Sequence, residues 1–213
     1  MVLGPSEIGA GTRLGLNVIV GYPRRSKFQG LKTNSEPVEL LDGISDGSRV
    51  GRECVLRAGS ALYEGAILGD RVSTGHNVLI REDSSVGEGS TLGTGTQLDG
   101  KVSIGRDCSI QSLVYLPVLT EVGSGTFIGP NVVVTNDKYP PSKRLVGVKI
   151  GEKCVIGANS TLMASVVIGG GSVVAAGSVV TKDVPRNIVV KGVPAVLYCT
   201  REEYDERKRA YER

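Results

Sequence analysis

The chain has 213 residues, enough for one good-sized domain, with 30 glycines and no tryptophan. Its 25 basic and 22 acidic residues give a net charge of +3, which is too balanced to indicate nucleic acid as the main partner. No N-terminal segment has the charged start and apolar run of a signal peptide, and no stretch approaches the ~20 apolar residues of a membrane span. We therefore expect a cytoplasmic protein with no membrane partner.

A six-residue period begins almost at the N-terminus, where aliphatic residues recur at Ile8, Leu14 and Val20. Residues 21–43 interrupt it, and their prolines and glycine predict a loop that projects from an early coil, with coiling resumed near Val38. The basic side chains of this loop have two interpretations, a phosphate clamp or an ordinary solvated loop. They are Arg24, Arg25 and Lys27.

The repeat is longest between Ile44 and Val134. Every sixth residue there is Val, Ile or Leu, except Thr74, and the residue two places before each is usually small. Neither the 3.6-residue period of a helix nor the alternation of a strand produces this spacing. It predicts a parallel β-helix of hexapeptide repeats, in which one large and one small residue per unit fill a narrow interior.

Three of the four cysteines, Cys54, Cys108 and Cys154, occupy the small position. Coils stack about 4.8 Å apart, so Cys54 and Cys108, three coils from each other, are separated by roughly 14 Å and lie beyond disulfide reach. We predict buried free thiols in a reducing compartment. The chain has a single histidine, which excludes a three-histidine zinc site, and no metal site is expected.

A second interruption follows Val134, and the repeat resumes at Ile150. The spacing is one unit plus ten residues, so a loop over 135–148 must project, stiffened by two prolines. Residues 1–199 are thus predicted to form the β-helix domain. Residues 200–213 begin with the capping-box sequence Thr-Arg-Glu-Glu and are predicted to form a helix that caps the last coil or docks on a neighbouring subunit.

Two parts of the sequence resemble those of a known enzyme family. The segment Ile-Gly-Pro-Asn-Val-Val-Val-Thr-Asn-Asp-Lys-Tyr-Pro from Ile128 resembles the loop region of sugar and nucleotide-sugar acetyltransferases. Residues 155–162, 173–185 and 190–195 resemble the coenzyme A end of those hexapeptide-repeat acyltransferases. The resemblance implies an all-β fold, a left-handed parallel β-helix with three repeats per 18-residue coil, projecting loops and a short C-terminal helix. The general rule for parallel crossovers favours the right-handed alternative.

The resemblance also implies a function. It is the transfer of an acetyl group from acetyl-CoA to an amino group, or a hydroxyl, of a sugar or nucleotide-sugar, with coenzyme A as product. It further implies a homotrimer with sites between subunits, and outward apolar residues are expected to need covering in that trimer: Val78, Val114 and Val132. The implied coenzyme contacts are Ala158, Ala176, Lys182 and Lys191.

The catalytic assignment has two competitors. Relatives carry a catalytic histidine in the loop, where this chain has Asn136 and Asp137. The alternative is His76, expected to point outward near a corner, either as a general base or as a surface bystander. Steps of 18 residues, corrected for the insertion, predict one column: His76, Thr94, Ser112, Pro130, Ala158 and Ala176. Predicted acceptor contacts are Arg81, Gln111 and Tyr139.

Other classes of protein are also compatible with hexapeptide repeats. A sugar-1-phosphate nucleotidyltransferase needs a further nucleotide-binding domain, for which residues 1–43 are too short. A non-catalytic structural or assembly subunit remains the alternative, although such a protein has no reason to keep the coenzyme-like segments. Within the enzyme class, the missing loop histidine favours N-acetylation, because an amine needs less help from a base than a hydroxyl does.

Overall fold

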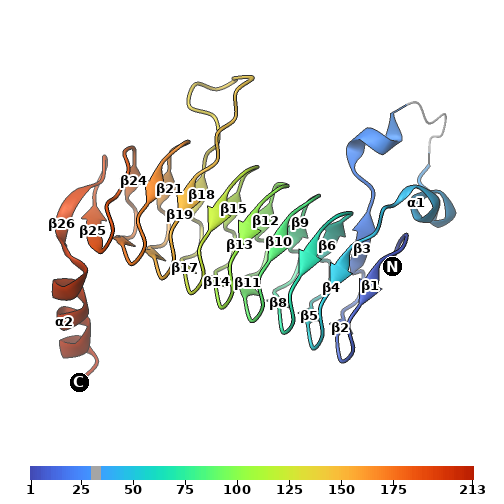
Figure 1. The fold of residues 1–213 in the computed structure, drawn as a ribbon, viewed down its shortest axis with the longest axis horizontal. Coiled ribbons are helices and arrows are strands. Elements are labelled where there is room, and N and C mark those ends of the chain that lie inside the picture. Colours follow the sequence, from blue (N-terminus) through green and yellow to red (C-terminus); the bar gives the residue numbers. More distant parts are fainter. Residues whose placement is uncertain (30–34) are drawn as a thin grey trace.

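The computed structural model describes residues 1–29 and 35–213, and it shows a chain wound into a parallel β-helix with three sheets (Figure 1). Sheet I contains β1 (Glu7–Ile8), β4 (Arg49–Val50), β7 (Ile67–Leu68), β10 (Ser85–Val86), β13 (Ser103–Ile104), β16 (Glu121–Val122), β19 (Lys149–Ile150) and β22 (Val167–Ile168). Sheet II contains β2 (Arg13–Leu14), β5 (Val55–Leu56), β8 (Ser73–Thr74), β11 (Thr91–Leu92), β14 (Ser109–Ile110), β17 (Phe127–Ile128), β20 (Val155–Ile156), β23 (Val173–Val174), β25 (Ile188–Lys191) and β26 (Val196–Thr200).

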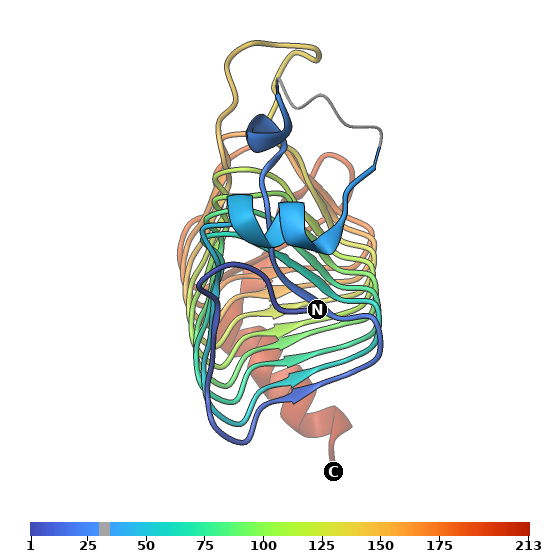
Figure 2. The ribbon, with the colours of Figure 1, turned by 90° about the vertical axis from the view of Figure 1, so that its right-hand side faces the viewer.

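Sheet III contains β3 (Ile19–Tyr22), β6 (Ala61–Tyr63), β9 (Leu79–Ile80), β12 (Gln97–Leu98), β15 (Tyr115–Leu116), β18 (Val133–Val134), β21 (Thr161–Leu162) and β24 (Val179–Val180). The chain passes from sheet I to II to III and back to I, so each coil has a I–II, a II–III and a III–I corner. Seen from the N-terminal end, the coils turn counter-clockwise as they recede, and the β-helix is left-handed (Figure 2). The winding implied by the resemblance is therefore confirmed, against the general crossover rule.

Strand register establishes the predicted 18-residue coil. Ser85 pairs with Ser103, and Val86 pairs with Ile104, in parallel. The ladder continues through backbone bonds between coils; the Gly87 amide, for example, donates to the Ile104 carbonyl at 2.8 Å. Because every coil repeats this register, equivalent residues lie directly above one another along the axis.

The interior is filled as the period predicts. The large aliphatic residues form one continuous buried core, and the small residues two places earlier are buried beside them. Their hydroxyl groups are satisfied: Ser90 Oγ donates to the Gly105 carbonyl at 2.8 Å and accepts from the Cys108 amide at 2.9 Å. Thr74, only 2% exposed, accepts from the Arg57 amide at 3.0 Å, which explains how a polar residue is tolerated in the aliphatic column.

The prediction of buried, free thiols at the three small positions is confirmed. Cys54, Cys108 and Cys154 are free and buried, and Cys199 is free and half-buried. Burial raises the pKa of the three core thiols above its ordinary value. These residues therefore act as small apolar fillers, with each Sγ weakly bonded to a carbonyl of the next coil.

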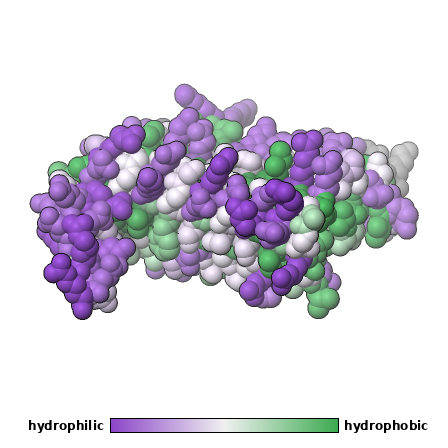
Figure 3. Space-filling model, turned by 60° about the horizontal axis from the view of Figure 1, so that its bottom comes forward, coloured by the Kyte–Doolittle hydropathy of each residue, from purple (hydrophilic) through white to green (hydrophobic). Residues whose placement is uncertain are grey.

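Two expectations about apolar positions are wrong. Val78, Val114 and Val132 do not point outward; each is at most 1% exposed, because each occupies the small inward position. The larger apolar side chains that are exposed on the coils lie elsewhere, and they include Leu14, Leu16, Ile67, Leu113, Leu119, Phe127, Val133 and Val167. Figure 3 shows such residues as separate patches on the face it presents.

Both insertions leave the β-helix at the III–I corner. Arg13 pairs with Val55, 42 residues along rather than 18, so 24 extra residues lie between β3 and β4. The second insertion lies between β18 and β19, at the same corner. The two therefore project from the same side of the molecule (Figures 1 and 2).

The first insertion contains helices that were not predicted. A 3₁₀ helix, η1 (Arg25–Phe28), is followed by α1 (Val38–Ile44), so coiling does not resume near Val38, and Ile44 is a half-buried helical residue. Pro37 directly precedes this helix, at a position where a backbone N–H would have no hydrogen-bond partner within the helix, so its missing N–H does not destabilise α1. The Asp42 carboxylate accepts from the Gly4 amide at 2.8 Å, which ties α1 to the first coil. Part of the predicted 21–43 loop, residues 30–34, lies outside the described residues.

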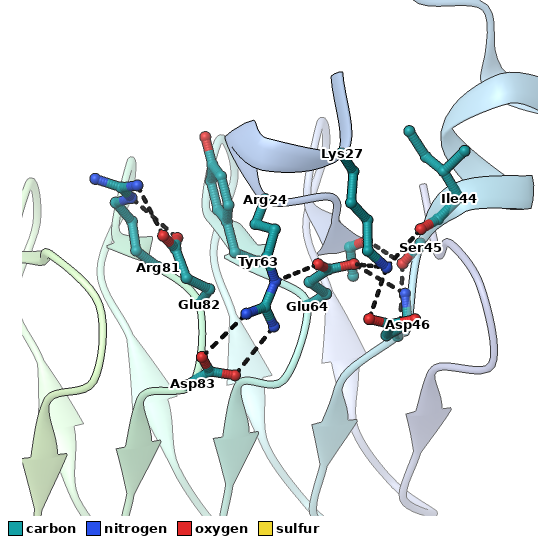
Figure 4. A network of polar contacts seen from close by, with 12 residues as sticks. Arg24, Lys27, Ile44, Ser45, Asp46, Tyr63, Glu64, Arg81, Glu82 and Asp83 are labelled. Carbon is teal, nitrogen blue, oxygen red and sulfur yellow. Dashed lines mark hydrogen bonds and ion pairs between the residues drawn. The ribbon is translucent and has the colours of Figure 1, made fainter. Parts of the chain in front are cut away.

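A buried carboxylate fastens this insertion to the β-helix (Figure 4). The Glu64 side chain is 0% exposed; it pairs with Arg24 Nε at 2.6 Å and Lys27 Nζ at 2.9 Å. It also accepts from the Asp46 amide at 2.9 Å. Burial raises the pKa of Glu64, but the Asp46 amide, Lys27 and Arg24 together hold it below its ordinary value.

The C-terminal end closes differently from the coils. β26 runs antiparallel to β25 and covers the last edge of sheet II, a strand that the sequence did not predict. Helix α2 (Arg201–Tyr211) follows, with Thr200 and Glu203 forming the predicted capping box. Arg201 Nη1 donates to the Gly171 carbonyl at 2.8 Å and so anchors the start of α2 to an earlier coil. Within the described residues, no helix has the length and apolar character needed to cross a membrane.

The Glu64 network predicts a pH-dependent contribution to stability. Because the folded pKa of Glu64 is depressed, its stabilising effect is present above the ordinary value of 4.5 and is lost as pH falls through the folded pKa. We expect Glu64→Gln to lower the free energy of unfolding at pH 7 by about 1.5–3 kcal/mol. Urea unfolding of both proteins between pH 7 and pH 3 measures the difference, which should narrow on acidification. A constant difference across this range would contradict the assignment.

Candidate active site

The predicted column exists as a row along the II–III corner. Five backbone bonds connect its members to the coil that follows: Gly95 N to His76 O at 2.9 Å, Leu113 N to Thr94 O at 2.9 Å, Asn131 N to Ser112 O at 3.1 Å, Asn159 N to Pro130 O at 3.0 Å, and Gly177 N to Ala158 O at 2.8 Å. The side chains of the row are exposed or half-buried. The row is therefore a continuous, accessible strip parallel to the axis, and we call it the corner row.

Glycines bring the coils close together at this corner. A Cβ on Gly75 would lie 2.4 Å from the Thr94 nitrogen, and one on Gly157 would lie 2.3 Å from the Ala176 nitrogen. No side chain fits at such distances without displacing backbone. The glycine that precedes these members of the row thus keeps each residue tightly stacked on the next coil.

His76 lies near one end of the row and is exposed, as predicted. Its backbone amide donates weakly to Thr94 Oγ1 at 3.3 Å. Within residues 1–29 and 35–213, the imidazole forms no hydrogen bond or ion pair. The ring is accessible to a ligand, and no carboxylate in the described part of the chain orients it.

Asn136 and Asp137 lie on a different corner. They begin the 135–148 loop after β18 in sheet III, whereas His76 precedes β9, three strands away in that sheet. The Asp137 carboxylate accepts from the amides of Tyr139 at 3.1 Å and Ser142 at 2.7 Å. The Asn136 carbonyl accepts from the Val146 amide at 2.8 Å. Within one chain, His76 therefore does not lie beside Asn136 and Asp137. The bonds of Asp137 to loop amides hold the loop in its conformation.

The predicted acceptor contacts are dispersed. Arg81 is held by Asp99 at 2.8 Å and Glu82 at 2.9 Å, while Gln111 Nε2 donates to Ser109 Oγ at 2.9 Å. Tyr139 is 77% exposed on the projecting loop. Of the three, Gln111 directly precedes Ser112 of the corner row, and Arg81 and Tyr139 lie at the III–I corner.

The predicted coenzyme contacts separate into two groups. Ala158 and Ala176 belong to the corner row, and Lys191 ends β25 at the same corner. Lys182 lies at the III–I corner, where it lines a groove of about 420 Å³ with Val184 and Pro194. Only the first group is contiguous with His76.

Lys191 has partners that the sequence did not reveal. Its Nζ lies 3.5 Å from the centroid of the Tyr198 ring, a cation–π contact. The Arg207 guanidinium lies 5.3 Å from the same centroid and donates to Tyr198 Oη at 2.8 Å. Tyr198 and Arg207 follow the last repeat, where no periodicity predicts their position. Two cations therefore share one ring at the C-terminal end of the corner row.

The phosphate-clamp interpretation of the first loop is wrong for two of its residues. Arg24 is neutralised by Glu64 and Asp83, and Lys27 by Glu64 and Asp46. The simple alternative of a solvated basic loop is also incomplete, because both cations are anchored to a buried carboxylate. Within the described part of the chain, no group of three or more His, Cys, Asp or Glu side chains is arranged to hold a metal ion.

Comparison with known proteins identifies the repeat. Residues 147–182 match the family model described as the hexapeptide repeat of succinyl-transferase. The same six-residue unit extends through the earlier coils by register. Residues 147–182 therefore carry this repeat, and the three sheets around them form a left-handed β-helix.

Two curated relatives share parts of the chain. YvoF of Bacillus subtilis strain 168, provisionally named an acetyltransferase, is 40% identical over 95 residues, which are 44% of this chain and 55% of YvoF. The 2,3,4,5-tetrahydropyridine-2,6-dicarboxylate N-acetyltransferase of Clostridium perfringens is 43% identical over 81 residues, 38% of this chain and 34% of that enzyme. The chain thus spans about half or less of the length of the curated relatives it matches.

A solved structure of similar shape is the polySia specific acetyltransferase NeuO, with 20% sequence identity and a TM-score of 0.49. The similarity covers 93% of this chain and 76% of that chain.

A glycine that precedes a member of the corner row should not tolerate an added methyl group, and its replacement by alanine should lower the stability of the protein. Gly157→Ala should lower the free energy of unfolding by about 1–3 kcal/mol, because its Cβ would overlap the Ala176 backbone. Gly43→Ala is the matched control. Gly43 lies in α1, and apart from its own helix backbone and chain neighbours no described atom lies within 4 Å of the added Cβ, so we expect a small gain of about 0.4–1 kcal/mol. Chemical denaturation of both variants measures the contrast, and equal effects would contradict close stacking at the corner.

Proposed function

We propose that this protein is an acetyl-CoA-dependent acetyltransferase that acts on an amino group of a sugar or nucleotide-sugar. The observation that carries the proposal is the corner row, which joins the only histidine to Ala158 and Ala176 in one accessible strip. A thin, linear pantetheine arm fits against small residues that repeat along an axis. The names of the curated relatives, both acetyltransferases, support the same class of reaction.

The chemistry is direct transfer. The acceptor amine attacks the thioester carbonyl, the tetrahedral intermediate expels the coenzyme thiolate, and the proton lost by the amine ends on that sulfur. His76 is the residue of the row suited to carry this proton. The hydroxyls of Thr94 and Ser112, next in the row, are suited to donate to the oxyanion.

We propose a homotrimer as the working form. His76 and the 135–148 loop occupy different corners of one chain, with sheet III between them. A neighbouring subunit that lays its loop against the corner row would bring Asn136 and Asp137 to the coenzyme. Exposed apolar residues on the coils, such as Leu113 beside Ser112, provide surface for such a contact.

The acceptor is the least constrained part of the proposal. One curated relative is named for a tetrahydropyridine dicarboxylate and not for a sugar. Amine acetylation is common to both possibilities and needs less base assistance than hydroxyl acetylation. A screen of amino-sugar nucleotides, amino sugars and amino acids for thiol release from acetyl-CoA tests the choice.

Coenzyme binding can be measured without knowledge of the acceptor. At 100 times its Kd, acetyl-CoA should stabilise the protein by about 2.7 kcal/mol and raise the Tm accordingly. Lys191→Ala should weaken this binding, since the ammonium group at the end of the row would no longer meet a phosphate. Lys101→Ala, which removes an exposed lysine from another corner, is the control. The absence of any shift with acetyl-CoA or coenzyme A would favour a non-catalytic structural protein.

The choice between His76 and the loop has its own test. If His76 is the general base, His76→Ala should lower kcat by about 10²–10⁴-fold. If it only positions the acceptor, the same change should mainly raise KM for the acceptor. Asp137→Asn is the informative comparison, because it removes the negative charge while keeping an oxygen that accepts from loop amides. Near-normal kcat/KM in His76→Ala with collapse in Asp137→Asn would move the chemistry to the loop.

A further inference from the structure

The 135–148 loop encloses a groove of about 310 Å³ against the β-helix. The groove is lined by Lys138, Tyr139, Ser142, Arg144, Val146, Ala164 and Ser165. Its floor is Ala164 and Ser165, which follow β21 at the III–I corner. The volume is at the lower end of the range for small-molecule sites, enough for one charged group and its neighbours.

The loop that forms this groove is held in place by its own bonds. Thr135 Oγ1 accepts from the Ala164 amide at 2.8 Å, and the Asn136 carbonyl accepts from the Val146 amide at 2.8 Å. The Asp137 carboxylate accepts from the Tyr139 and Ser142 amides. The only carboxylate of the loop is thus committed to backbone donors.

The cations of the groove have no carboxylate partner within the described residues. Lys138 and Arg144 form no ion pair there, and Lys138 Nζ lies 5.9 Å from the centroid of the Tyr139 ring. In the first insertion, by contrast, Arg24 and Lys27 are both neutralised by Glu64. The hydroxyl groups of Ser165 and Tyr139 add hydrogen-bond donors around the same space, whereas Ser142 Oγ donates to the Arg144 carbonyl at 3.4 Å.

We propose that this groove binds an oxyanion, a phosphate or a carboxylate, carried by the acceptor substrate. The guanidinium fork of Arg144 matches the paired oxygens of either group, and Lys138 adds a second positive charge. The proposal rests on the proposed function and makes the acceptor an anionic amine. Within one chain the groove lies at the III–I corner, apart from the row assigned to the coenzyme at the II–III corner. In the proposed trimer a neighbour's groove would face that row, so an acceptor held in the groove would present its amine to the thioester.

The test measures binding of simple anions to the full-length protein. Inorganic phosphate, UDP and succinate are titrated by calorimetry at 0.15 M salt, with coenzyme A titrated separately. At least one of the three anions should bind, and Arg144→Gln and Lys138→Gln should each weaken it by about tenfold or more. Coenzyme A affinity should stay unchanged. Preference for UDP and phosphate over succinate identifies a phosphate group, and the reverse identifies a carboxylate.

Arg106→Gln is the matched control, because it removes the same charge from an exposed position on the I–II corner. If Arg106→Gln weakened anion binding as much as Arg144→Gln does, the effect would come from the overall charge of the protein and not from this groove, and the proposed site would be wrong. Loss of coenzyme A affinity in Arg144→Gln would assign the groove to the coenzyme and overturn its assignment to the acceptor. Failure of all three anions to bind at 10 mM would also overturn it. Failure of coenzyme A to bind the wild-type protein would instead contradict the proposed function, while the anion titrations remain readable.

Discussion

Vertical register is the constraint on which this structure depends. Each strand bonds to the strand one coil away, so every inward side chain lies over its equivalent and the interior has one cross-section throughout. One large and one small residue fill that section in each unit, and small hydroxyls bond to carbonyls of the adjacent coil. The same register turns a period in the sequence into a straight row on the surface, and so creates the strip that carries His76.

The register also decides where extra residues go. A coil cannot absorb additional length without breaking its ladders, so insertions must leave at a corner. Here both leave at the III–I corner, yet the cations of the two insertions are paired differently. The first is fastened by the buried Glu64, which neutralises its cations. In the second, Asp137 binds backbone amides, and Lys138 and Arg144 have no acidic partner among residues 1–29 and 35–213.

The candidate site was predictable where the repeat determines position. The row from His76 to Ala176 follows from steps of 18 residues with one correction, and the backbone bonds confirm it. The outward placement assumed for Val78 and its equivalents was wrong, because the residue two before the large one also faces inward. The period itself contained that information, since these positions are equivalent to those of buried serines and cysteines.

The sequence by itself determined the hexapeptide coil, the buried thiols, the two sites of insertion and the capped C-terminal helix, because each depends on local spacing or local residue chemistry. Only the tertiary structure decided which charges are neutralised. The Arg24–Glu64 pair joins residues from different coils, and Lys191 meets Tyr198 where the chain reverses into β26. Such contacts arise where the repeat stops. Beyond that point no periodicity fixes the path of the chain, and the long-range approach of side chains sets their partners.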